Sequence, residues 1–326
     1  TKHSFPTRRS SDLPNEHNIE MLNSISGAGD VSFGRTSTGR CRYVNGFPGT
    51  LSYTGRTIVE WSGGGYTQSP YYQSSLWLEK QNVLPSTTIL EMRSGNFFLR
   101  YNNTSGQTVG GISGNVGTYI STIDTKLQKL TVNVAADASY DFAGTIGRLA
   151  DSATYNNYTI IKTGPGTQIF SGRNTFTGGV SITQGTLLVN NTEGSGTGWK
   201  NTASVAAGAA LGGSGTALND LTTVASGGML KPGNPGVIGT LTVSNLTLAA
   251  GSVLNWKCGP LGQDLVNVLG DVTLPAVATV MVSRLTSDDY PGIGAVLTHG
   301  GANNGATDLS GWTVLVEGSS TPASCS

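Results

Sequence analysis

Hydrophobic and polar residues alternate with a period of two along most of this chain. Val180-Ser181-Ile182-Thr183 and Leu246-Thr247-Leu248 show the pattern plainly. Such alternation is typical of β-strands that bury one face and expose the other. Helical periodicity is nearly absent, and the best helix candidate is the stretch 119–130. The pattern therefore predicts a chain built from many short strands.

A short glycine- or alanine-rich turn followed by leucine recurs four times. The leucines, separated by 24, 19 and 24 residues, are Leu187, Leu211, Leu230 and Leu254. Repeats of roughly 20 to 50 residues are the mark of stacked architectures, in which one coil cannot bury its apolar face alone. We therefore predict an all-β solenoid whose coils hold the four leucines in line along one axis.

The alternation also assigns side chains to the inside or the outside of the predicted coils. The polar residues expected to point outward are Ser181, Thr183, Asn245 and Thr247. The apolar residues expected to point inward are Val180, Ile182, Leu187, Val189, Leu211, Leu230, Leu241, Val243, Leu246, Leu248 and Leu254.

Composition is consistent with such a fold. Only 12% of the 326 residues are charged, and the 47 glycines are about twice the ordinary share. A disordered chain of this polarity would carry more proline and more charge. Lys plus Arg and Asp plus Glu balance at 19 each, so no basic excess is present to attract nucleic acid. No apolar run approaches the ~20 residues of a membrane-spanning helix.

The first residues differ from the rest. Residues 4–13, SFPTRRSSDL, resemble the in-frame translation of a common sequencing adapter. We therefore treat residues 1–14 as an artefactual or disordered segment, a genuine disordered tail being the alternative. Without that segment, 16 basic and 18 acidic residues remain, a net charge near −2. A missing natural N-terminus would explain why no signal peptide is seen.

The stretch 159–191 closely resembles the autotransporter-associated β-strand repeat. Its Lys-Thr-Gly-x-Gly-Thr turn corresponds to residues 162–167, its Ser-Gly-x-Asn-Thr-Tyr-Thr-Gly-Gly segment to 171–179, and its Gly-Thr-Leu strand to 185–188. Phenylalanine replaces the usual tyrosine. The motif residues are Lys162, Gly164, Gly166, Thr167, Ser171, Gly172, Asn174, Thr175, Phe176, Thr177, Gly178, Gly179, Gly185, Thr186 and Leu187.

The resemblance implies a right-handed parallel β-helix that is extracellular or attached to the bacterial surface. On this interpretation residues 15–109 are an N-terminal β-rich capping part. Residues 110–317 are the β-helix that carries the repeat, and residues 318–326 are a disordered or truncated tail.

The motif residues also have structural interpretations. Asn174 is suited to bond the backbone within a turn, and Gly178-Gly179 to form a corner. Thr175 and Thr177 suit exposed strand positions. We expect Phe176 to pack inward or between coils.

Candidates for catalysis or metal binding are few. Glycoside hydrolysis needs two carboxyls about 5 to 10 Å apart, but Asp288-Asp289 precedes Tyr-Pro-Gly and fits a solvated turn. Asp264 and Asp271 leave a calcium site open as an alternative. No Gly-x-Ser-x-Gly nucleophile elbow is present to act with His299 as a catalytic base. The glycine-rich segment 212–216 lacks the lysine of a phosphate-binding loop. We predict no catalytic, metal or cofactor site.

Two further groups of residues leave alternatives open. Cys41, Cys258 and Cys325 match no zinc or disulfide spacing, so unpaired thiols are expected, with a Cys258–Cys325 bridge as the alternative. An aromatic cluster, expected to cap the end of the solenoid or else to stack on sugar rings, consists of Trp61, Tyr66, Tyr71, Tyr72 and Trp77.

The repeat, together with the lack of a catalytic cluster, favours a stiff stalk or adhesin-like module that contacts surface glycans or other cell-surface components. The first alternative is a polysaccharide-active enzyme on the same scaffold. A self-associating matrix protein is the second.

Overall fold

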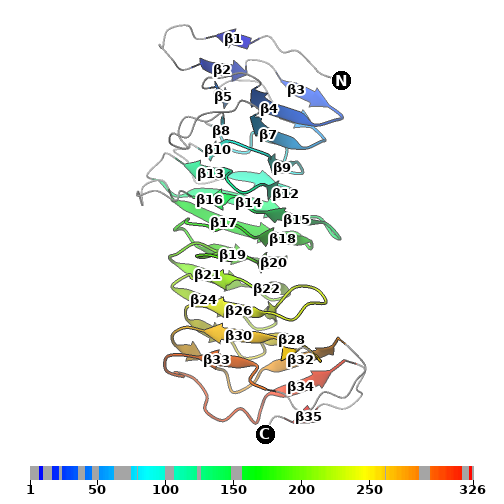
Figure 1. Ribbon diagram of the computed structural model, residues 1–326, viewed down its shortest axis with the longest axis vertical. Coiled ribbons are helices and arrows are strands. Elements are labelled where there is room, and N and C mark those ends of the chain that lie inside the picture. Colours follow the sequence, from blue (N-terminus) through cyan, green and yellow to red (C-terminus); the bar gives the residue numbers. More distant parts are fainter. Residues whose placement is uncertain are drawn as a thin grey trace.

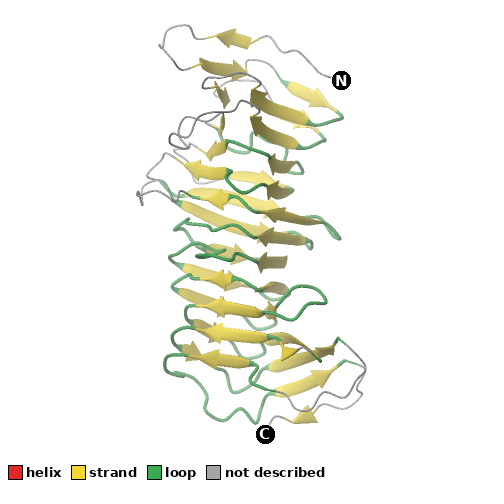
Figure 2. Ribbon diagram, viewed as in Figure 1, coloured by secondary structure: helices red, strands yellow, loops and turns green. Residues whose placement is uncertain are grey.

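The computed structural model of the chain is an elongated stack of β-strands with its termini at opposite ends (Figure 1). It describes residues 7–9, 17–21, 24–35, 41–45, 51–61, 75–78, 80–99, 106–122, 126–147, 156–260, 262–285, 294–317 and 323–324. Within these ranges the regular structure is β-strand (Figure 2), and no helix capable of crossing a membrane is found.

The largest sheet has 14 described strands and runs the length of the rod. Two of them, β29 (Gly262–Gln263) and β35 (Ala323–Ser324), pair antiparallel. The parallel strands are β4 (Val31–Arg35), β7 (Thr57–Trp61), β9 (Ile89–Met92), β12 (Gly111–Gly114), β15 (Ser139–Phe142), β18 (Thr167–Phe170), β20 (Gly185–Val189), β22 (Ala209–Gly213), β25 (Met229–Pro232), β28 (Val253–Gly259), β32 (Thr279–Arg284) and β34 (Thr313–Val316).

A second, 8-stranded parallel sheet forms another wall of the rod. Its strands are β11 (Gln107–Val109), β14 (Gln128–Asn133), β17 (Tyr158–Thr163), β19 (Val180–Ile182), β21 (Thr202–Val205), β24 (Leu221–Val224), β27 (Leu246–Leu248) and β31 (Val272–Thr273).

The third wall is interrupted. Its N-terminal part is a 7-stranded sheet of β1 (Thr7–Arg9), β2 (His17–Met21), β5 (Cys41–Asn45), β8 (Ser75–Leu78), β10 (Asn96–Leu99), β13 (Tyr119–Thr122) and β16 (Thr145–Ile146). Its C-terminal part is a 4-stranded sheet of β23 (Thr216–Ala217), β26 (Thr240–Val243), β30 (Leu265–Val268) and β33 (Leu297–His299). Near the N-terminus a separate pair is formed by β3 (Ile25–Gly27) and β6 (Leu51–Tyr53).

Successive coils pass through the three walls in the same order. β24 in the 8-stranded sheet is followed by β25 in the 14-stranded sheet and then by β26 in the third wall. β27, β28 and β30 repeat the sequence one coil later. Because the strands that recur from coil to coil pair in parallel, with β1, β29 and β35 as antiparallel additions, the all-β parallel solenoid predicted from the alternation is confirmed. The right-handedness of the helix stays a prediction.

The four repeat leucines form one continuous row inside the rod. Each is the register partner of the next across neighbouring strands of the 14-stranded sheet. All four are at most 1% exposed. The row continues through Val280 to Val314, which confirms the predicted axis.

The predicted division between inside and outside is also confirmed. The eleven residues expected inside are each at most 2% exposed. Thr183 is exposed, whereas Ser181, Asn245 and Thr247 are half-buried because the neighbouring coils flank their side chains.

The described parts of the stretch 119–130, residues 119–122 and 126–130, are not helical, so that candidate is wrong. Residues 119–122 form β13 and residues 128–130 begin β14. Each of these strands has parallel partners on both sides. Pairing with neighbouring coils decides the conformation here, because strand formation depends on context more than on local propensity.

The polar residue Gln168 lies in the interior, one coil before the first leucine of the leucine row. Gln168 is fully buried and is the register partner of Leu187. Its Oε1 accepts a hydrogen bond from Ile112 N at 3.0 Å, and its Nε2 donates to Ile112 O at 2.8 Å. The side chain thereby satisfies backbone groups where β12 and β15 share a single register pair, Gly114 and Phe142.

Truncation of the leucine row should be costly. We expect Leu211→Ala to lower the free energy of unfolding by about 2–5 kcal/mol, because it removes a fully buried side chain and leaves a cavity. Val116, which is 83% exposed, provides the control: Val116→Ala should change stability by less than about 0.5 kcal/mol. Urea unfolding followed by circular dichroism measures both, and equal effects would contradict the row.

Candidate functional site

Lys162 of the repeat turn points into the rod and is fully buried. Its Nζ donates hydrogen bonds to the backbone oxygens of Thr163 at 2.8 Å, Gly164 at 2.7 Å and Gln184 at 3.1 Å. Gln184 belongs to the following coil, between β19 and β20. The lysine therefore ties together the corners of two successive coils.

Burial has an electrostatic consequence for this lysine. It lowers the pKa of the Lys162 ammonium to about 8, because the charged form loses its hydration inside the rod. The carbonyl oxygens around Nζ replace part of that hydration. The side chain accordingly has a structural role at a position where most proteins place an uncharged residue.

The glycines of the motif allow two coils to meet at this corner. Gly164 has φ of +72° and Gly185 has φ of +69°. Residues that carry a Cβ rarely adopt this left-handed backbone region. A Cβ on Gly185 would also lie 2.3 Å from Gly164 O. Replacement of either glycine would push the coils apart.

Asn174 holds the third wall together where it has no strands. The segment 171–177 is irregular, and Asn174 within it is fully buried. Its Oδ1 accepts a hydrogen bond from Ile146 N at 2.7 Å, and its Nδ2 donates to Gly196 O at 2.7 Å. One side chain thus links the preceding and following coils. Sequence reasoning foresaw bonding to the backbone, but within a turn instead of between coils.

Two further asparagines continue this arrangement toward β23. Asn191 Oδ1 accepts a hydrogen bond from Thr216 N at 3.1 Å. Asn219 Nδ2 donates to Thr197 O at 3.1 Å and to Lys200 O at 2.9 Å. Side-chain amides therefore bridge the gap between the 7-stranded and 4-stranded sheets.

The other motif side chains are placed as follows. Phe176 is fully buried. Thr175 is buried and lies outside any strand, so the expected exposed strand position is wrong for it. Thr177 also lies outside any strand and is half-buried, so the expectation is wrong for it too; its hydroxyl donates to Asn156 O at 3.2 Å. The segment curls inward to fill the third wall, because no regular strand occupies that space.

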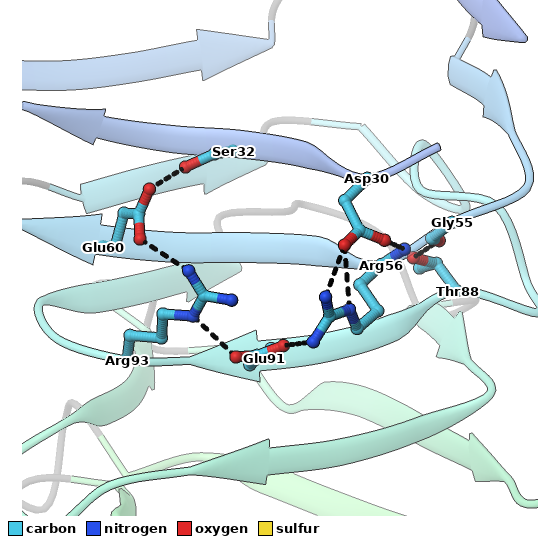
Figure 3. Close-up of polar contacts among 8 residues, drawn as sticks. All are labelled: Asp30, Ser32, Gly55, Arg56, Glu60, Thr88, Glu91 and Arg93. Carbon is cyan, nitrogen blue, oxygen red and sulfur yellow. Dashed lines mark hydrogen bonds and ion pairs between the residues drawn. The ribbon is translucent and has the colours of Figure 1, made fainter. Parts of the chain in front are cut away.

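Sequence reasoning missed a charged ladder on the outer surface of β4, β7 and β9 (Figure 3). Arg56 contacts Asp30 and Glu91, each at 2.6 Å, and Arg93 contacts Glu91 at 2.6 Å and Glu60 at 2.9 Å. The ladder consists of Asp30, Arg56, Glu60, Glu91 and Arg93.

Each carboxylate of the charged ladder is committed to an arginine. Hydrogen bonding to Arg56 lowers the pKa of Asp30, and the Ser32 hydroxyl, followed by Arg93, lowers the pKa of Glu60. Side-chain exposures of 18% to 47% leave the pairs open to solvent, where ion pairs contribute little and are screened by salt. The ladder thus connects three successive coils through ion pairs on the outer surface.

Of the two aspartates left open as an alternative calcium site, Asp264 is instead a partner in a buried ion pair. Its Oδ2 lies 2.7 Å from Lys257 Nζ, and its Oδ1 accepts a hydrogen bond from Gly239 N at 2.9 Å. Burial raises the pKa of the Asp264 carboxyl, and these hydrogen bonds oppose the rise. Asp271 is exposed and accepts from Ala302 N at 2.8 Å.

No group of three or more potential metal ligands occurs among the described residues. His299 is exposed, and its Nδ1 lies 2.9 Å from Gly301 O. Cys258 is buried and free. The predicted turn at Asp288-Asp289, together with Cys325, falls outside the described residues.

The N-terminal aromatic cluster is only partly described. Trp77 is buried and packs against Phe98 with ring centroids 4.9 Å apart. Because β8 lies between β5 and β10 in its sheet, Trp77 does not cap an end, and the capping expectation is wrong for this residue. Tyr66, Tyr71, Tyr72 and the side chain of Trp61 fall outside the described residues, as does the side chain of Cys41.

Removal of the Asn174 amide should destabilise the rod. Asn174→Ala would leave Ile146 N and Gly196 O buried without partners, at an expected cost of roughly 2–4 kcal/mol. Asn115→Ala is the matched control, because the exposed side chain of Asn115 donates a hydrogen bond to Arg93 O that water can replace. Chemical denaturation compares the two; similar small effects would show that Asn174 does not hold the wall.

Lys162 should make stability depend on pH. Between about pH 8 and about pH 10.5 the folded chain has released the Lys162 proton and the unfolded chain still holds it. Unfolding then takes up a proton, so stability rises with pH across this window, whereas below it the cost of burying the charge is fully present. Relative to Lys162→Met, the natural chain should gain roughly 1–3 kcal/mol from pH 7.5 to pH 10.5. Urea unfolding of both proteins at each pH measures this difference. If the free energies of unfolding of the natural chain and of Lys162→Met changed with pH in the same way, the prediction would be contradicted.

Comparison with known proteins identifies the same segment. The family model described as the passenger-associated-transport-repeat matches residues 160–189. The adhesin BmaC autotransporter of Brucella suis biovar 1 (strain 1330) is 33% identical over 188 residues, which cover 55% of this chain and 5% of that protein. The chain thus spans a small part of this curated relative. The resemblance inferred from the motif is confirmed: the chain carries a passenger-type transport repeat within a parallel β-solenoid and is similar to an autotransporter adhesin.

Proposed function

We propose that this chain is part of a secreted or cell-surface passenger-type protein that acts as a stiff stalk or adhesin-like contact module and not as an enzyme. The observation that carries the proposal is the passenger repeat embedded in a continuous stack of parallel coils. Such a stack holds its outer walls at fixed spacing, so it suits extended contact with another surface.

The interior and the charged groups support the same role. The apolar rows and the third-wall asparagines serve coil-to-coil contact. The carboxylates of the charged ladder are held by arginines, and Asp264 is held by Lys257. The name of the relative, an adhesin, supports attachment as the activity of the whole protein.

Attachment can be measured directly. Beads coated with the folded chain should adhere to cultured animal cells or to bacterial surfaces more strongly than beads coated with albumin. The contact surface depends on stacked coils. Beads coated with the Asn174→Ala variant, after mild heating has unfolded it, should therefore lose adhesion. Equal adhesion of chain-coated and albumin-coated beads to every surface would leave only a spacer role.

The enzyme alternative is tested on the same preparation. Release of reducing ends or unsaturated sugars from a panel of bacterial and plant polysaccharides would overturn the non-catalytic part of the proposal.

A further inference from the structure

Trp199 stands out among the tryptophans whose side chains are described. It is 40% exposed, whereas Trp77, Trp256 and Trp312 are at most 8% exposed. Trp199 lies in the turn that leads from the third wall into β21 of the 8-stranded sheet. A large aromatic side chain left in solvent at a defined corner is a candidate contact for a ligand.

Hydrogen bonds from both neighbouring coils fix the turn that carries Trp199. Trp199 N donates to Phe176 O of the preceding coil at 3.3 Å. From the following coil, Asn219 Nδ2 donates to Lys200 O at 2.9 Å, and Asp220 Oδ2 accepts from Asn201 N at 3.0 Å. The backbone beneath the ring is therefore set before any ligand arrives, which reduces the ordering that binding must supply.

Asn201, two residues after Trp199, has an unusual backbone conformation. Asn201 has φ of +59°, the left-handed region that residues other than glycine seldom occupy. Its Nδ2 donates to Thr177 O in the preceding coil. Backbone held in this region by its surroundings is concentrated at binding and catalytic sites.

Arg173 lies against the ring itself. The Arg173 Cζ atom lies over the Trp199 ring, 5.9 Å from its centroid, a cation–π distance. The stem of Arg173 crosses Gly194, where a Cβ would lie 2.8 Å from Arg173 Cγ. The absence of a side chain at Gly194 lets the arginine lie across the coil and orient the indole.

A row of hydroxyl groups runs beside this turn along the 8-stranded sheet. Five half-buried residues follow one another in register across β19, β21, β24, β27 and β31. Neighbouring strands lie about 4.8 Å apart, so the row is an evenly spaced series of donors and acceptors without formal charge. The hydroxyl row consists of Ser181, Ser204, Thr223, Thr247 and Thr273.

The ring and the row are close enough to contact one ligand. Five peptide units separate Trp199 from Ser204, so their Cα atoms are at most about 18 Å apart. The turn and the segments next to it carry two basic residues, Arg173 and Lys200, and two acidic residues, Glu193 and Asp220, so their formal charges balance. A neutral ligand with an apolar face and a hydroxylated rim would satisfy both parts of the surface.

We propose that Trp199 and the adjoining hydroxyl row bind a neutral oligosaccharide. One pyranose ring stacks on the exposed part of the indole, and following sugar units exchange hydrogen bonds with Ser204 and its neighbours in the hydroxyl row. This inference rests on the proposed attachment function and names the class of partner.

The test uses the full chain on an array of neutral and sialylated oligosaccharides of glucose, galactose, mannose and N-acetylglucosamine, followed by calorimetry with the best neutral tetrasaccharide. Trp199→Ala should weaken binding at least about tenfold, because it removes the stacking surface. Trp199→Tyr should retain most of the affinity. Leu127→Ala, at a residue 52% exposed beside the same sheet, should bind like the natural chain.

Unfolding curves should be alike for these three variants, so that loss of binding is not loss of fold. Absence of binding to every glycan, binding to sialylated glycans only, or unchanged affinity in Trp199→Ala would overturn the proposal. Adhesion of coated beads without glycan binding would overturn this inference and leave the attachment function standing. Loss of both would reject the attachment function as well.

Discussion

The structure depends on register between successive coils. In the two unbroken walls the strands hydrogen-bond to their equivalents one coil away, and this pairing brings residues about 19 to 35 positions apart into one buried row or one surface ladder. The leucine row, the charged ladder and the hydroxyl row all follow from that periodic pairing. A shift of one residue would turn every inward side chain outward, so the interior and the outer walls are fixed together.

Polar side chains appear inside the rod where the regular ladder fails. Gln168 fills the gap between β12 and β15, Asn174 replaces strand bonds in the third wall, and Lys162 joins two corners through carbonyl oxygens. In each case a buried backbone group would otherwise lack a partner, at a cost of about 1–3 kcal/mol. The passenger repeat is thus a local solution for hydrogen bonding, and its residues face other coils more than they face solvent.

Sequence alone was sufficient for features that repeat and insufficient for features that occur once. The spacing of Leu187, Leu211 and Leu230 fixed the axis, because the same residue type recurs at the same place in each coil. The charged ladder, from Asp30 to Arg93, lies in a part of the sequence without a recurring motif. The length of each coil there could not be read from the sequence, so the ion pairs could not be predicted. Trp199 depends on Arg173, Gly194 and Asn219 in three coils, a constellation that only the register reveals.

The interrupted third wall also bears on how such a rod can change over evolutionary time. Between β16 and β23 the wall is closed by amide side chains and irregular backbone, whereas the other two walls keep unbroken parallel pairing. Extra residues inserted into a paired strand would disturb both neighbours, but extra residues in the irregular wall need only loop outward. New surface loops can therefore be gained on this one side while the axial spacing of the molecule stays the same.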